Sequence, residues 1–193
     1  EAHAHDHESE EEGANAGHSH TVDPHVWLDP VLAQTEVSTI AEGLAEADPD
    51  NAEDYLENAG IYNGKLNELD EAYRAAFEGT ENRTFVTQHA AFAYLAARYD
   101  LNQISVTGLN AEVEPSAAAL ATLSDYVKAN NISHIYFENN ASSQTAETLA
   151  EEVGVELAVL SPLEGITEED QKKGSDYISV MLDNLEALKK SIN

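Results

Sequence analysis

Hydrophobic residues recur every three or four positions in the stretch that follows Pro49. They are Tyr55, Ala59, Tyr62, Leu66, Leu69, Tyr73 and Phe77. This spacing places them on one face of a helix. The pattern therefore predicts one long helix over residues 49–77. A shorter helix over residues 30–47 is predicted ahead of it, because Asp29-Pro30 pairs a favoured N-cap residue with a favoured first helical residue.

After Gly79 the pattern changes to short apolar runs that alternate with helical periodicity. Strands are expected at residues 83–87, 103–107, 134–138 and 155–160, and helices at 90–99, 115–130, 143–153 and 174–190. Strands of this kind alternating with helices indicate a parallel sheet covered by helices on both faces. The fold class is therefore α/β, with a four-stranded parallel sheet. Ligands bind such sheets at the carboxyl ends of the strands.

The first 22 residues, EAHAHDHESEEEGANAGHSHTV, have almost no large apolar side chain. Such a segment cannot offset its ordering entropy by burial, so we expect it to be disordered. It contains five of the eight histidines, namely His3, His5, His7, His18 and His20. Imidazoles on a flexible acidic chain bind divalent metal ions, which predicts an accessory metal-capture segment. A cloning tag or a solubilising linker remains the alternative.

Composition excludes several classes of function. The chain has 9 Lys+Arg against 37 Asp+Glu, and its formal net charge of −28 repels nucleic-acid phosphates. Because there is no Cys, disulfides and thiolate metal sites are excluded. No apolar run approaches the ~20 residues of a membrane span. The sequence starts at Glu1 and its one Met is Met181, so we expect a processed or truncated chain.

Three histidines lie outside the N-terminal segment, and two of them are candidate metal ligands. His89 follows the strand 83–87 and Glu164 follows the strand 155–160, so both belong at the carboxyl-end rim of the sheet. His25 lies in a turn bounded by prolines and reaches this rim if its segment packs over the sheet. Two imidazoles and a carboxylate suit Zn²⁺. Spacing alone leaves open that the histidines cap a turn and a helix while Glu164 is a solvated loop residue.

His134 and Glu138 stand at opposite ends of one predicted strand. His134 opens the strand and is therefore expected at the far rim, where we interpret it as structural. Glu138 ends the strand at the same rim as His89. It is a rival carboxylate ligand, or it bonds backbone donors beside the site.

Four motifs carry a family resemblance: DPHVWLDP, TFVTQHAAFAYLA, HIYFENNASSQTAETLAEEVGVE and LSPLEG. With the His-rich stretch before them, they resemble the metal-binding solute-binding proteins of ABC importers, specifically the zinc branch (ZnuA/AdcA type). The resemblance covers nearly all of residues 20–193. It implies two α/β lobes joined by one long helix, with the metal between the lobes. Residues 23–47 would then be a remnant of the N-terminal lobe, 48–78 the connecting helix and 83–193 the C-terminal lobe.

The resemblance also implies the ligands. They fall on His25, the histidine of DPHVWLDP, on His89, the histidine of QHAAF, and on Glu164, the acid of the PLE loop. A further histidine from the N-terminal lobe normally completes the site, so three ligands are expected in this chain. The manganese branch usually has a carboxylate where His89 stands, and an imidazole there favours Zn²⁺. The family role of the His-rich stretch is to gather zinc for this site.

The function expected from this resemblance is binding rather than catalysis. The protein would capture Zn²⁺ outside a bacterial cell, at the membrane-anchored surface or in the periplasm, and deliver it to an ABC permease. A manganese-binding member of the same family is one alternative. A zinc-dependent hydrolase is another, since His, His and Glu with an open position is also a catalytic ligand set. A surface adhesin or metal buffer on the same fold is the third.

Overall fold

The computed structural model describes most of the chain after the N-terminal segment. The described residues are 22–106, 108–109, 117–130, 132–138, 147, 150–151, 154–165 and 168–193. The predicted accessory metal-capture histidines lie outside them.

Four parallel strands form the central sheet, as predicted. They are β1 (Thr84–Thr87), β2 (Asn102–Ser105), β3 (His134–Phe137) and β4 (Glu156–Val159), in the spatial order β2-β1-β3-β4. From β1 the chain crosses to β2 on one side and then to β3 on the other side of β1. The carboxyl ends of β1 and β3 are therefore the topological switch point, where ligands of open α/β sheets bind.

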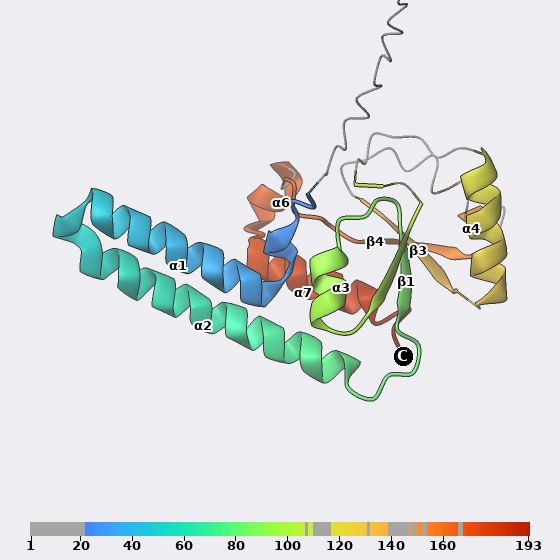
Figure 1. Cartoon of the computed structure of the whole chain (residues 1–193), viewed down its shortest axis with the longest axis horizontal. Helices are drawn as coiled ribbons and strands as arrows, with labels where there is room; N and C mark the ends of the chain where they lie inside the picture. Colours follow the sequence, from blue (N-terminus) through green and yellow to red (C-terminus); the bar gives the residue numbers. More distant parts are fainter. Residues whose placement is uncertain are drawn as a thin grey trace, which may run out of the picture.

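Both faces of the sheet are covered, which explains why consecutive residues of β1 and β3 are buried. Phe85 and Tyr136 belong to a core cluster with residues of helices α2 (Ala52–Phe77), α3 (Ala93–Arg98) and α7 (Tyr177–Leu188). Their neighbours Val86 and Ile135 belong to a second cluster with α4 (Ala117–Ala129). Figure 1 shows α4 on one side of the sheet and α3 and α7 on the other. The expected α/β layer is confirmed.

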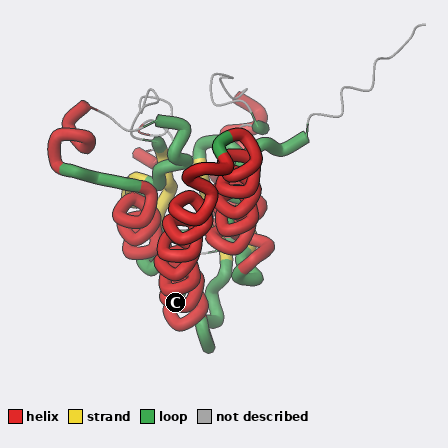
Figure 2. Tube along the Cα trace, turned by 90° about the vertical axis from the view of Figure 1, so that its left-hand side faces the viewer, coloured by secondary structure: helices red, strands yellow, loops and turns green. Residues whose placement is uncertain are grey.

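Helix α1 (Pro30–Ala47) lies alongside α2, and the two project from the sheet as a long hairpin (Figure 1). Figure 2, turned by 90°, shows these helices in front of the strands. The predicted long helix is present, but its first residues form a separate 3-10 turn, Pro49–Asn51. The carboxyl-terminal half of α2 enters the core through buried side chains that include Leu66 and Tyr73. At the distal end Leu56 remains 50% exposed.

Helix α3 begins at Ala93, so the prediction that it starts at residue 90 is wrong. The backbone amides before it are used elsewhere: Gln88 N donates to Tyr136 O (2.9 Å) and Ala90 N to Gly108 O (3.0 Å). The carbonyl of His89, which would accept the first hydrogen bond of a helix starting at residue 90, instead accepts from Thr87 Oγ1 and Gln103 Nε2. His89 therefore lies in a loop between β1 and α3, and not in a helix cap.

The carboxyl-terminal region holds two helices where one was expected from residue 174. Helix α6 (Glu168–Lys173) precedes Gly174, whose φ of 79° ends a helix rather than starting one. Helix α7 begins at Tyr177, after a capping box formed by Asp176 and Ser179. In the helix expected over residues 143–153, Glu147, Ala150 and Glu151 are described and helical.

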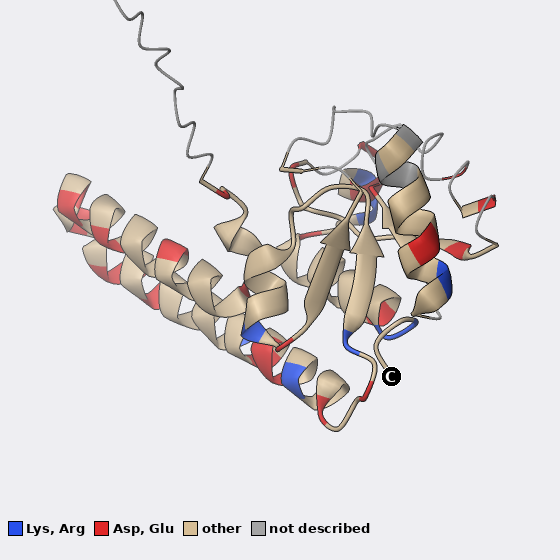
Figure 3. Ribbon diagram, turned by 45° about the vertical axis from the view of Figure 1, so that its right-hand side comes forward, with Lys and Arg blue, Asp and Glu red and all other residues tan. Residues whose placement is uncertain are grey.

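Acidic residues recur along the α1–α2 hairpin, as Figure 3 shows. Within the described part of the chain, no helix combines the length and the apolar character that crossing a membrane requires.

Candidate metal site

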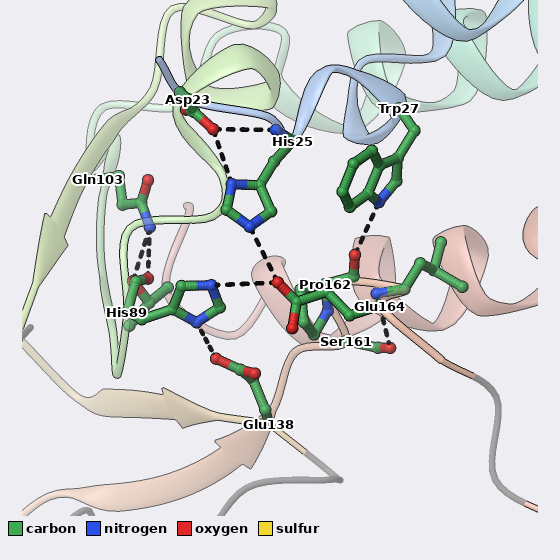
Figure 4. Close-up of polar contacts among 11 residues, drawn as sticks. Asp23, His25, Trp27, His89, Gln103, Glu138, Ser161, Pro162 and Glu164 are labelled. Carbon is green, nitrogen blue, oxygen red and sulfur yellow. Dashed lines mark hydrogen bonds and ion pairs between the residues drawn. The ribbon is translucent and has the colours of Figure 1, made fainter. Parts of the chain in front are cut away.

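Three side chains from distant parts of the sequence meet at the carboxyl-end rim of the sheet (Figure 4). His89 follows β1, Glu164 lies in the loop after β4, and His25 precedes the 3-10 turn Val26–Leu28. One possible ligand atom from each lies within 4.8 Å of the others. The rim expected from strand polarity thus holds the three residues that the sequence pointed to.

The two imidazoles direct their Nε2 atoms toward one carboxylate oxygen. His25 Nε2 lies 3.0 Å from Glu164 Oε1, and His89 Nε2 lies 3.8 Å from the same oxygen. Both histidines are buried, at 2% and 1% exposure, whereas the Glu164 side chain is 38% exposed. The arrangement is a cluster of nitrogen and oxygen donors in which Glu164 is the member exposed to solvent.

His89 Nε2 is buried and has no hydrogen-bond partner in the structure. A buried polar atom without a partner is unusual and calls for a ligand or another explanation. Two imidazole nitrogens and one carboxylate oxygen at this spacing fit a Zn²⁺ ion, which takes four ligands of these types. The donor set would bind a divalent transition metal, with further positions open to another ligand.

The other ring nitrogen of each histidine, Nδ1, also faces a carboxylate. His25 Nδ1 lies 2.7 Å from Asp23 Oδ1, which accepts a second hydrogen bond from His25 N at 3.0 Å. His89 Nδ1 is hydrogen-bonded to Glu138 Oε1. From the sequence, Glu138 was either a rival metal ligand or a partner of backbone donors. In the structure it instead contacts Nδ1 of His89. Asp23 was not singled out, although its place two residues before His25, ahead of Pro24, is the signal of a local turn.

Side chains from β1 and β2 hold the backbone of His89 in place. Thr87 Oγ1 donates to His89 O at 2.7 Å, and Gln103 Nε2 donates both to Thr87 Oγ1 at 2.7 Å and to His89 O at 3.1 Å. These bonds replace the helical bonds that the loop lacks.

Trp27 connects the His25 segment to the Glu164 loop. Its indole Nε1 donates to Pro162 O at 2.9 Å, and its own carbonyl accepts from the Tyr177 hydroxyl at 2.7 Å. Within the loop, Leu163 adopts a φ of 55°, a left-handed backbone conformation that residues other than glycine seldom adopt. This loop geometry turns the chain immediately before Glu164.

His134 lies apart from these residues, at the start of β3. Its Nε2 is 3.4 Å from Glu156 Oε2, and its Nδ1 is 2.8 Å from the hydroxyl of Ser133. It lies at the opposite end of the sheet, the position expected from strand direction.

Comparison with known proteins identifies the family. A family model described as zinc-uptake complex component A, periplasmic (ZnuA), matches residues 1–191. The chain belongs to the ZnuA family. Among ZnuA-type relatives, the zinc-binding protein AdcA of Streptococcus pyogenes serotype M1 is 54% identical over 173 residues, which are 90% of this chain and 34% of AdcA. The high-affinity zinc uptake system protein ZnuA of Bacillus subtilis (strain 168) is 50% identical over 174 residues, 90% of this chain and 54% of that protein.

This member of the ZnuA family therefore spans between about a third and about half of the length of these relatives. Among solved structures, the Zn(II)-bound ZnuA-like domain of Streptococcus pneumoniae AdcA has a TM-score of 0.77 at 51% identity, over 88% of this chain and 63% of that one. The laminin-binding protein Lmb of Streptococcus agalactiae, described as having adhesin and metal-transporting activity, has a TM-score of 0.80 at 36% identity, over 88% of this chain and 64% of that one. The α/β fold is that of ZnuA-like domains.

Proposed function

We propose that this chain captures Zn²⁺ on the outer side of a bacterial membrane, in the periplasm or at the anchored cell surface, and delivers it to an ABC permease. The observation that carries the proposal is the convergence of His25, His89 and Glu164 within 4.8 Å. The names of the relatives as zinc-binding and zinc-uptake proteins support the same reading.

The ligand types favour zinc over the alternatives. Imidazole nitrogen is a better ligand for Zn²⁺ than for the harder Mn²⁺, which prefers oxygen. Hydrolysis would need an activated water with a free general base beside the metal. Glu138, a buried acid beside His89, is instead hydrogen-bonded to Nδ1 of His89. Binding and delivery, rather than catalysis, is the reading that the donor set supports.

The partners follow from the open side of the site. Three ligands leave a fourth position of Zn²⁺ free, and Glu164 is the ligand exposed toward solvent. We assign the surface that would lie opposite Glu164 to an N-terminal lobe of the same protein. Residues 23–47 would be the last piece of that lobe, 48–78 the connecting helix and 83–193 the C-terminal lobe. The histidines of residues 1–22 would gather zinc and pass it to this site.

Alanine variants test the assignment in the full chain. His3, His5, His7, His18 and His20 are first replaced by alanine, so that the N-terminal segment no longer binds zinc. Chelator competition should then show one tight equivalent of Zn²⁺. His89→Ala should lower the affinity by more than about 100-fold, because loss of a ligand exceeds the 10–100-fold effect typical of outer-shell partners.

His134→Ala is the matched control, because it removes an imidazole at the other rim. Equal effects of the two variants would reject the site. Zinc-dependent ester hydrolysis that disappears in His89→Ala would favour the hydrolase, and tighter binding of Mn²⁺ than of Zn²⁺ would favour the manganese alternative.

A further inference from the structure

We propose that Glu138 is a positioning residue that holds His89 in the tautomer able to bind metal, and that Asp23, the corresponding partner of His25, has a smaller effect. The inference rests on the proposed zinc function, which it deepens. It concerns residues that would not touch the metal but would prepare its ligands before the metal arrives.

The argument starts from the chemistry of neutral imidazole. One ring nitrogen carries a hydrogen and the other carries the lone pair, so only the second can bind a metal ion. An ionised carboxylate accepts hydrogen bonds and cannot donate them. A carboxylate placed against Nδ1 therefore favours the tautomer with hydrogen on Nδ1, and leaves the lone pair on Nε2.

Both histidines have a carboxylate against Nδ1. Asp23 Oδ1 is 2.7 Å from His25 Nδ1, and Glu138 Oε1 is hydrogen-bonded to His89 Nδ1. In each ring the opposite nitrogen, Nε2, points toward Glu164 (Figure 4). In His25 that nitrogen is itself 3.0 Å from Glu164 Oε1, a contact that opposes the preference set by Asp23, whereas His89 Nε2 has no hydrogen-bond partner. The contacts therefore select a single tautomer only at His89.

The two carboxylates differ in their surroundings. The Asp23 side chain is 18% exposed and shares its oxygen with the backbone amide of His25. Glu138 is 4% exposed and reaches His89 across the switch point between β1 and β3. Hydrogen bonds to a charged group are stronger where water is excluded. The preference that Glu138 imposes on His89 is therefore the larger one.

His134 provides an internal contrast. Its Nδ1 faces the hydroxyl of Ser133, which can donate or accept, so this contact selects neither tautomer. Its Nε2 faces Glu156, whose side chain is 84% exposed. Glu156→Gln is therefore the matched control for Glu138→Gln: it changes the same chemical group beside a histidine, but away from the site.

The experiment measures tautomers and zinc affinity in the full chain with the five N-terminal histidines replaced by alanine. Long-range ¹H–¹⁵N correlation spectra of the metal-free protein report which ring nitrogen carries hydrogen, and chelator competition reports zinc affinity. In the parent protein we expect His89 to carry hydrogen on Nδ1. Glu138→Gln should introduce the other tautomer at His89, because an amide can also donate to Nδ1, and should weaken zinc binding about 10–100-fold.

Asp23→Asn should have a smaller effect on both measurements, and Glu156→Gln should have none. Glu138→Asp retains the charge and should recover part of the lost affinity. A merely structural role for Glu138 would lower stability without moving the tautomer.

Two results would overturn the inference: hydrogen on Nε2 of His89 in the metal-free parent protein, or unchanged tautomer and affinity in Glu138→Gln. The parent spectrum decides the first point even where a variant fails to fold. The proposed function fails in a different way, since zinc binding would then survive His89→Ala. Loss of binding in His89→Ala together with full binding in Glu138→Gln rejects the positioning role alone.

Discussion

At the scale of single residues, Asp29 shows how one buried carboxylate joins two elements. Its Oδ1 accepts from Val31 N at 2.8 Å and so caps α1, while its Oδ2 accepts from Arg98 Nε of α3 at 2.8 Å. Its hydrogen bond to Arg98 raises the pKa of that guanidinium. Asp29 is 3% exposed, so its loss would leave both partners without an acceptor.

Asp29→Ala should lower the free energy of unfolding by roughly 2–4 kcal/mol, since it removes an N-cap and leaves a partly buried Arg98 unpaired. Chemical denaturation measures the loss. Asp29→Asn is the control, because asparagine caps helices as well as aspartate but cannot form the ion pair. It should lose less than the alanine variant, and equal losses would mean that the cap contributes nothing here.

At the scale of elements, the segment that carries His25 is held against the loop that carries Glu164. The hydrogen bond from Trp27 Nε1 to Pro162 O is the direct link between the two. The ring of Trp27 also lies 5.4 Å from the ring of His25, centroid to centroid. The relative position of two ligands from distant parts of the sequence therefore depends on this side chain.

Trp27→Phe should weaken zinc binding about fivefold, which is the equivalent of one net hydrogen bond of about 1 kcal/mol. Chelator competition in the histidine-free N-terminal background measures it. Tyr73→Phe is a matched control, because it removes a hydroxyl bond to Met181 O (2.7 Å) between α2 and α7, far from the rim. That variant should lose stability and keep its zinc affinity. A similar loss of zinc affinity in Trp27→Phe and Tyr73→Phe would show that the loss comes from lower overall stability and not from the Trp27 hydrogen bond.

At the scale of the whole molecule, several tyrosines tie the helices to the sheet and to one another. The Tyr136 hydroxyl of β3 donates to Ala187 O at 2.8 Å, and burial raises the pKa of Tyr136 to about 12. Burial also raises the pKa values of Tyr73, Tyr99 and Tyr177 above the ordinary value of 10.0. The folded protein therefore holds these protons more tightly than the unfolded chain.

Stability should consequently be lost in alkaline solution. The contribution of Tyr136 is fully present below pH 10.0, where the unfolded chain also keeps its proton, and is lost as the pH rises to about 12. Denaturant titrations across this range should show a falling free energy of unfolding. Phenolate absorbance should rise in step with unfolding. A stability that is constant from pH 9 to about 12 would contradict this account.

Much of the fold was readable from the sequence because helix and strand periodicity is a local property. The apolar spacing from Tyr55 to Phe77 predicted α2, and four short apolar runs predicted the four parallel strands. Two helix boundaries were predicted wrongly. The carbonyl of His89 is bonded by the side chains of Thr87 and Gln103, so α3 begins later than its apolar spacing suggests, and Gly174 ends a helix that periodicity alone did not show.

The sequence by itself determined the elements and the rim to which His89 and Glu164 belong, because strand direction decides which end of a sheet a following residue reaches. Only the tertiary structure decided what each ring contacts. Glu138 meets His89 because β3 lies beside β1 in the sheet. The bond from Trp27 to Pro162 likewise exists because a segment that precedes the sheet in the sequence lies across its carboxyl-end rim. Such pairings depend on the packing of distant segments, which no local pattern encodes.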